Sequence, residues 1–346
     1  MKAIAQRREG TTAEALVGTV LCHDIRDGAG KIVAHKGARL DAAGAASVLG
    51  APWAEIHLLA LDAGDLHEEQ AGARVASAVV GDGVEVKGYG GGQWTLTAIR
   101  RGLVGVNVAS LQEVNSHGAI SVFTIFDGQP VEPGEVVARA KVTPLVVAET
   151  TIQTVEATAR RTRGILVVNA FKSFSVGVVA RENLDDKQRT RFETALRQKV
   201  DWVGGSLLSV RYAGASPQAV AAELTALGRE GAQLLIVAGA SALDPLDPVF
   251  AGLDLLSARM ERHGAPAHPG SLLWLARWGG RTILGMPTCG MFSQATTFDL
   301  VLPRIFACET VGNAEIAALG HGGLLSRDMA YRFPQYRANV ARGELE

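Results

Sequence analysis

The chain has 346 residues, of which 47% are hydrophobic and 20% are charged, a profile typical of a globular protein with two or three domains. A net charge of −1, an aromatic content of only 5% and the lack of a long Lys or Arg run argue against nucleic-acid binding. The three cysteines share no C-x-x-C spacing, which argues against disulfides and structural zinc, and no run of about 18 apolar residues predicts a membrane span. We therefore expect a cytoplasmic protein that is neither exported nor membrane-spanning.

Residues 1–145 carry strand-like segments between glycine turns, which predicts an α+β, β-rich N-terminal region of one or two small subdomains. Apolar or alternating runs place strands at 16–21, 55–61, 94–99, 120–126 and 136–142. Asp41 is suited to cap a short helix, and residues 66–76 form a second helical pattern. The glycines at 88–92 have no helix signal after them, so we expect a hairpin loop there rather than a phosphate loop.

Residues 146–330 change to alternating helices and strands, and residues 331–346 are predicted to be a C-terminal tail. The pattern predicts helices at 149–163, 185–200, 216–229 and 248–262, strands at 165–169, 175–180, 206–211, 233–237 and 281–284, and a last helix that buries Phe292, Ala295, Phe298 and Leu302. Continuous apolar strands are typical of a parallel sheet covered by helices. We therefore predict an α/β fold whose C-terminal domain is a doubly wound, mostly parallel sheet with helices on both faces.

The candidate site begins where the strand at 233–237 ends. In such sheets ligands bind beyond the carboxyl ends of the strands, and the small residues Gly239, Ala240, Ser241 and Ala242 follow at that place. Their backbone N–H groups would suit a phosphate. Asp244 and Asp247 come next and offer the oxygen ligands that Mg²⁺ prefers. The alternative is an ordinary strand, turn and helix start, in which Asp247 caps the helix that begins at Pro248.

Two later turns are expected to reach the same crevice. The ligand-binding candidates in them are His268, Pro269, Gly270, Gly285, Pro287, Thr288, Cys289, Gly290 and Ser293. His268 would bond a phosphate or would simply be an exposed turn residue. Cys289 precedes a predicted helix, where a thiolate is favoured, although a small buried cysteine is the ordinary alternative.

These turns resemble the molybdopterin-binding domain family of molybdenum cofactor biosynthesis, which includes MoeA- and MogA-like proteins. The matching positions are Gly239 to Ala242 with Asp247, then Pro269 with Gly270, then Gly285 to Thr288. The N-terminal segments VGTVLCHDI, AHKGARL, LHEEQAGARVA and VNVASLQEVN resemble a subgroup of longer, uncharacterised molybdopterin-binding proteins. Two positions depart from the family pattern, because Ala240 and Thr288 stand where glycines are usual. The usual sequence at the first strand of the domain is not clearly present either, and Arg181-Glu182-Asn183 is its nearest candidate.

The resemblance implies a compact α/β fold and a transferase of molybdenum cofactor biosynthesis. Such an enzyme would adenylylate molybdopterin with Mg-ATP or insert molybdate into the adenylated form, with Asp247 and Asp244 as catalytic metal ligands. The alternative function is a non-catalytic carrier, chaperone or sensor of molybdopterin or the finished cofactor. A third reading is an unrelated nucleotide-binding α/β protein. The expected partners are molybdopterin or its adenylated form, a client molybdoenzyme and further copies of this chain in a homo-oligomer.

Overall fold

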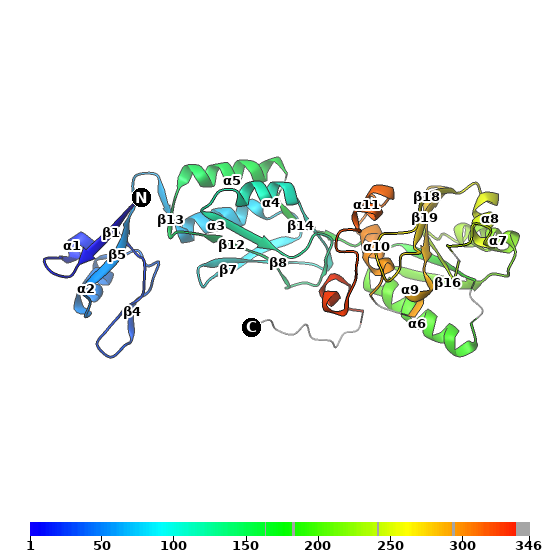
Figure 1. Ribbon diagram of the computed structural model, residues 1–346, viewed down its shortest axis with the longest axis horizontal. Helices are drawn as coiled ribbons and strands as arrows, with labels where there is room; N and C mark the ends of the chain where they lie inside the picture. The colour runs from blue at the N-terminus through cyan, green and yellow to red at the C-terminus, as the bar shows by residue number, and fades with distance from the viewer. Residues whose placement is uncertain (163, 182–183, 241, 293–294, 337–346) are drawn as a thin grey trace. The chain divides into compact units, whose positions relative to one another are not determined.

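The computed structural model describes residues 1–336, except 163, 182–183, 241 and 293–294 (Figure 1). The chain divides into two compact units. Unit 1 comprises Met1–Ile99, Gly105–Asp127 and Pro133–Val168, and unit 2 comprises Arg100–Val104, Gly128–Glu132 and the chain from Asn169 onward. No helix among the described residues is long and apolar enough to cross a membrane.

Unit 1 combines small antiparallel sheets with helices. Its elements are β1 (Lys2–Arg7), α1 (Ala13–Leu16), β2 (Val20–Leu21), β3 (Ile25–Arg26), β4 (Ile32–Ala34), α2 (Ala42–Gly50), β5 (Glu55–Ala60), β6 (Asp65–His67), α3 (Glu68–Val79), β7 (Val84–Gly90), β8 (Gln93–Ala98), α4 (Val108–Asn115), β10 (Ile120–Thr124), β12 (Val136–Val142), β13 (Val146–Ala148) and α5 (Glu149–Arg161). The largest sheet has the strand order β10-β12-β8-β7, and α3 packs on β8 and β12. The chain also contains the strands β9 (Gly102–Val106), β11 (Pro130–Val131) and β14 (Leu166–Ala170).

The strands predicted at 55–61, 94–99, 120–126 and 136–142 and the two predicted helices are present, whereas β1, β3, β4, β6, β7, α4 and β13 were not predicted. The predicted hairpin is present, with Gly88 and Gly90 in β7 and with Gly91 and Gly92, both at positive φ, connecting β7 to β8. The strand predicted at 16–21 is wrong for residues 16–19, because α1 ends at Leu16 and β2 begins only at Val20. Gly18 separates them with a φ of 84°, a left-handed conformation that interrupts a regular strand.

Unit 2 is built on a mixed sheet of six strands. Its elements are β15 (Ser175–Ala180), α6 (Asp186–Trp202), β16 (Ser206–Tyr212), α7 (Pro217–Arg229), β17 (Leu234–Ala238), α8 (Pro248–Leu255), β18 (Arg259–His263), β19 (Trp274–Trp278), β20 (Arg281–Met286), α9 (Thr288–Phe292), α10 (Thr297–Phe306), α11 (Asn313–Ala318) and the short 3₁₀ helix Arg327–Arg332. The strand order is β16-β15-β17-β20-β19-β18. The first four of these strands are parallel, and β19 and β18 add antiparallel pairs.

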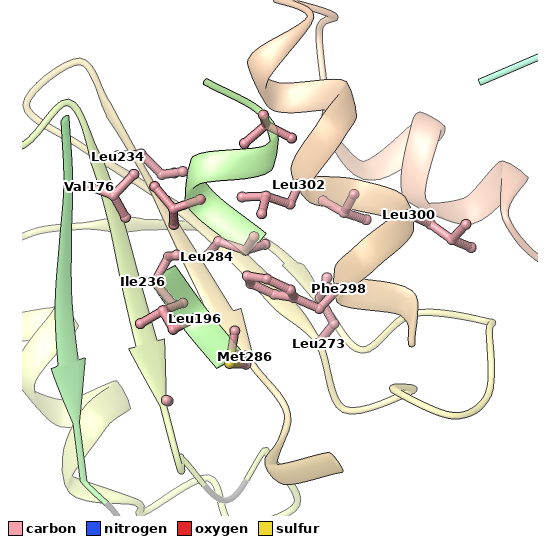
Figure 2. Close-up of a cluster of buried hydrophobic side chains, with 14 of the residues drawn as sticks. Val176, Leu196, Leu234, Ile236, Leu273, Leu284, Met286, Phe298, Leu300 and Leu302 are labelled. Atoms are coloured by element: carbon pink, nitrogen blue, oxygen red, sulfur yellow. The ribbon is translucent and has the colours of Figure 1, made fainter. Parts of the chain in front are cut away.

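Helices cover both faces of this sheet. Consecutive side chains of a strand point to opposite faces, so a continuous apolar strand supplies core residues to both of them. On one face, Val176, Leu234, Ile236 and Leu284 pack with residues of α6 and α10 such as Leu196, Phe298 and Leu302 (Figure 2). On the other face, Leu235, Val237 and Ile283 pack with Val220, Leu224 and Leu227 of α7 and with Val249 and Leu253 of α8. The predicted continuous apolar run at 234–237 therefore forms a strand buried from both sides.

Three expectations for the C-terminal half are corrected. The helix predicted at 248–262 ends at Leu255, because Ser257 takes a φ of 53° and the chain continues as β18. The strand β19 was not anticipated. The single last helix is two helices, α9 and α10, and the second begins at Thr297 behind a capping box of Thr296 and Asp299.

Candidate functional site

The strand order of unit 2 creates a point at which the chain changes direction across the sheet. From β15 the chain crosses to β16 on one side, and from there it returns to β17 on the other side. The carboxyl ends of β15 and β17 therefore lie side by side, with Ala180 paired to Ala238 and the Arg181 N–H donating to the Ala238 carbonyl at 3.0 Å. Ligands of open α/β sheets bind at such a place. The predicted turn at 239–242 follows directly from it.

Arg181 and Asp247 meet at this edge. Arg181 Nη2 donates to Asp247 Oδ2 at 2.6 Å, and the Asp247 side chain is only 1% exposed whereas that of Arg181 is 22% exposed. Asp247 Oδ1 accepts the Val249 N–H at 2.9 Å, and Pro248 stands at the first helical position. The capping alternative for Asp247 is therefore confirmed. Arg181 Nε is buried and has no hydrogen-bond partner among the described residues.

The geometry does not fit a magnesium site centred on Asp247. Its two carboxylate oxygens already accept bonds from Arg181 and from the Val249 backbone, and a guanidinium at 2.6 Å repels a divalent cation. Asp244 is exposed and its Oδ1 accepts the Leu246 N–H at 2.9 Å. Within the described part of the chain, no group of three His, Cys, Asp or Glu side chains could hold a metal ion.

The turn of small residues after β17 is partly buried, and the loop that continues from it is exposed. Gly239 takes a φ of 84°, which favours glycine, and Ala240 and Ala242 are partly buried against the core beside α7 and α8. The Ala242 carbonyl lies 2.7 Å from Nε2 of His263, so this carbonyl is already engaged. Ser241 lies outside the described residues. Beyond the turn, Leu243 and Leu246 are 78% and 85% exposed and flank Asp244.

The second predicted turn is tied to the start of α10. His268 is exposed, and its backbone N–H donates to the Gly323 carbonyl at 2.7 Å. The Thr297 N–H donates to the Pro269 carbonyl at 2.9 Å, and Gly270 takes a φ of 110°. A Cβ on Gly270 would meet the Thr297 backbone nitrogen at 2.8 Å. Close packing against α10 therefore explains this glycine, and the ligand role of the turn stays a prediction.

The third predicted turn follows β20. Gly285 faces the indole of Trp274 on the neighbouring strand, so closely that a Cβ would overlap the ring. Pro287 and Gly290 are buried, whereas Thr288 and Cys289 are exposed. The protein around the Cys289 sulfur raises the pKa of the thiol by desolvation, and the nearby Asp299 charge raises it further. This is opposite to the thiolate that a helix start would favour. Ser293 lies outside the described residues.

The sequence-based prediction missed a buried polar network at the start of α10. Lys199 of α6 pairs with Asp299, and the Tyr336 hydroxyl donates to Asp299 Oδ1 at 2.9 Å. The Thr296 hydroxyl donates to Asp299 Oδ2 at 2.8 Å. The sequence did contain a signal of this network, because the charged Lys199 interrupts the apolar stripe of Phe192, Leu196 and Val200 on α6. The T-x-x-D spacing of Thr296 and Asp299 was a second signal, because it is the pattern of a capping box at a helix start.

Comparison with known proteins gives distant likenesses. No protein-family model and no curated protein matches the chain. Among solved structures, the chain resembles Molybdenum cofactor biosynthesis protein B at 10% identity and a TM-score of 0.29, over 39% of this chain and 88% of that one. It resembles the molybdopterin biosynthesis MoeA protein from Pyrococcus horikosii at 13% identity and a TM-score of 0.29, over 70% and 81% of the two chains. For MogA the identity is 18% and the TM-score 0.23, over 35% and 86%. At such identities and TM-scores, these likenesses assign neither a family nor an activity to this chain.

Proposed function

We propose that this chain binds molybdopterin, free or adenylated, at the carboxyl edge of the unit 2 sheet, and that it acts in molybdenum cofactor biosynthesis. The sequence motifs at 239–247, 269–270 and 285–288 support this class of ligand. The first motif lies beyond the adjacent carboxyl ends of β15 and β17, which supports binding at this edge of the sheet.

The observation that carries the proposal is the Arg181–Asp247 pair beneath the turn. Asp247 anchors one guanidinium nitrogen, so the orientation of Arg181 is set before a ligand arrives. A guanidinium has five N–H donors, and one carboxylate oxygen uses only one of them. Arg181 is partly exposed and stands beside the turn that opens with Gly239. Such a fixed cation next to a glycine turn is suited to the phosphate of molybdopterin.

The geometry favours a carrier, chaperone or sensor over a transferase. Catalysis of adenylyl transfer was expected to use Asp247 and Asp244 as magnesium ligands, and the Arg181 contact opposes that role for Asp247. Binding of the phosphate requires no metal. Adenylylation with Mg-ATP, or molybdate insertion, is the second candidate function, because the exposed Asp244 carboxylate lies three residues away in the same loop.

The test measures molybdopterin binding and turnover with the purified full chain. The double variant Arg181→Gln/Asp247→Asn removes the charged pair together, so that no buried charge is left without its partner. We expect molybdopterin to bind at least about tenfold more weakly to this variant, the size of one lost charge-assisted hydrogen bond. Arg197→Gln on the exposed side of α6 is the matched control and should bind as the wild type does.

Two further measurements test the role of the phosphate and distinguish a carrier from a transferase. A dephosphorylated pterin should bind equally to the wild type and to the double variant, because the phosphate is the group that Arg181 contacts. Formation of adenylated product with Mg-ATP would favour the transferase, and its absence alongside tight binding would favour the carrier. Failure of the wild type to bind molybdopterin at all would refute the proposal.

A further inference from the structure

A groove separate from the Arg181 site runs between α6 and α9 in unit 2. Lys187, Thr190, Arg191, Thr194 and Gln198 line it from α6, and Phe292 closes it at the end of α9. These two helices pack against one another, as Figure 1 shows. Its volume is about 460 Å³, which falls within the roughly 300–1,000 Å³ of small-molecule sites.

The groove carries positive charge. Lys187 and Arg191 are four residues apart on α6, so they lie one above the other on the same face of the helix. No carboxylate is among the described residues that line the groove. The nearby acid Glu193 is engaged elsewhere, since its Oε1 accepts the Tyr212 hydroxyl at 2.9 Å. An anion entering the groove therefore meets two cations and no carboxylate among the described lining residues, and Asp186, which precedes Lys187 in the sequence, lies one turn before Thr190 at the start of the helix.

The threonines add hydrogen-bond acceptors beside the cations. The Thr190 hydroxyl donates to the Asp186 carbonyl at 2.9 Å, and the Thr194 hydroxyl donates to the Thr190 carbonyl at 2.7 Å. Each hydroxyl proton is thus used within the helix, and the lone pairs of each oxygen can accept a bond from a ligand. A ligand that matches the two threonine oxygens carries N–H or O–H donors next to its anionic group.

Phe292 supplies an aromatic wall. Its ring is partly buried, and the Arg191 guanidinium lies 5.4 Å from the ring centroid. This cation–π contact holds Arg191 over the groove and leaves the guanidinium edge for an anion. Aromatic and guanidinium planes both stack on planar rings.

We infer that the α6–α9 groove binds a small ligand that combines a phosphate group with a planar, donor-bearing ring, as in a nucleoside monophosphate. The cations take the phosphate, the threonine oxygens accept donors, and Phe292 contacts the ring. This inference does not depend on the molybdopterin proposal, because none of the described residues that line the groove belongs to the Arg181–Asp247 site.

The test is calorimetric titration of the full chain with AMP and with inorganic phosphate, at low and high salt. We expect AMP to bind more tightly than phosphate and to weaken as salt rises, since exposed cations contact the anion. Arg191→Ala should weaken AMP binding about tenfold or more, and Thr194→Val should weaken AMP binding without affecting phosphate binding. The matched control is Arg197→Ala, an exposed arginine on the same helix that does not line the groove.

Each contrary result overturns a stated part of the inference. If AMP does not bind, or if Arg191→Ala and Arg197→Ala bind it equally, the groove is not the site. Equal binding of AMP and phosphate would refute the roles of the threonines and Phe292. Loss of AMP binding in Arg181→Gln/Asp247→Asn, with Arg191→Ala unaffected, would place the nucleotide at the sheet edge instead and would leave the molybdopterin proposal standing.

Discussion

Lys199 of α6 and Asp299 of α10 stand 100 residues apart in the sequence and form an ion pair in which the side chains are 1% and 0% exposed. Asp299 also accepts bonds from the Thr296 N–H at 3.0 Å and from the Tyr336 hydroxyl at 2.9 Å. The Lys199 ammonium lies 4.9 Å from the centroid of the Tyr336 ring. One buried carboxylate thus links α6, the first turn of α10 and the C-terminal segment.

Replacing Lys199 with methionine is expected to lower the free energy of unfolding by about 3–5 kcal/mol, because Asp299 would remain buried without its cation. Chemical denaturation with urea measures this change. Arg197→Met, an exposed neighbour on the same helix, should change stability by less than about 0.5 kcal/mol. Equal stability of the two variants would show that the Lys199–Asp299 pair is not needed for folding.

Tyr336 gives the network a dependence on pH. Burial raises the pKa of Tyr336 well above 10, and the Asp299 charge and hydrogen bond add to the shift. An unfolded tyrosine ionises near pH 10, so the folded state keeps the proton at pH values where the unfolded state loses it. The contribution of Tyr336 to stability is therefore complete below about pH 10 and is lost as the pH rises toward the folded pKa.

The variant Tyr336→Phe should remove this part of the pH dependence. Urea unfolding of wild type and variant at several pH values between about 8 and 11 measures the difference in their free energies of unfolding. The difference should shrink above about pH 10, because only the wild type loses the contribution there. Tyr89 and Tyr212, whose pKa values are raised to about 12, are present in both proteins and cancel in the comparison. A difference that stays constant with pH would contradict the prediction.

Asp247 is expected to stabilise the fold through its cap. Asp247→Asn keeps an oxygen that can accept the Val249 N–H, whereas Asp247→Ala keeps none. Thermal unfolding should therefore show Asp247→Ala to be less stable than Asp247→Asn by about 1 kcal/mol. Asp244→Ala, in the exposed part of the same loop, should stay within about 0.5 kcal/mol of wild type. If both Asp247 variants were as stable as wild type, the cap and ion pair would have no role in folding.

Gly285→Ala tests whether packing explains this glycine. The added methyl would overlap the Trp274 indole, which is 1% exposed, so the variant should lose about 1–3 kcal/mol. Combining it with Trp274→Leu should cost less than the sum of the two single changes, because the smaller side chain makes room. Urea denaturation of the three variants measures the coupling. Strict additivity would show that the glycine is needed for another reason.

Local structure was predictable wherever a few neighbouring residues decide it. Asp41, Asp185, Ser216 and Asp247 each cap a helix and accept an N–H two or three residues ahead. The strand at β15 was predicted with its bounds, because its apolar run ends at charged residues. Such features depend on side chain and backbone within a single turn.

Segments that depend on distant partners were predicted poorly. β19 is paired on both sides, by β18 and β20, and its sequence WLARW has little alternation to reveal it. The helix after Asp247 was extended into β18 because nothing in the local pattern marked Ser257 as the stop. In both cases strand pairing, a tertiary interaction, overrides a weak local preference.

The sequence by itself determined the class of fold, the apolar strands of unit 2 and the turns that follow β17 and β20, since burial and chain reversal follow from residue type. Only the tertiary structure decided what those residues contact. Arg181 and Asp247 are 66 residues apart and meet because β15 and β17 are neighbours in the sheet. Gly285 is explained by Trp274 on the adjacent strand. Strand order and helix packing set these contacts, and residues far apart in the chain carry no local signal of which partner the fold will bring to them.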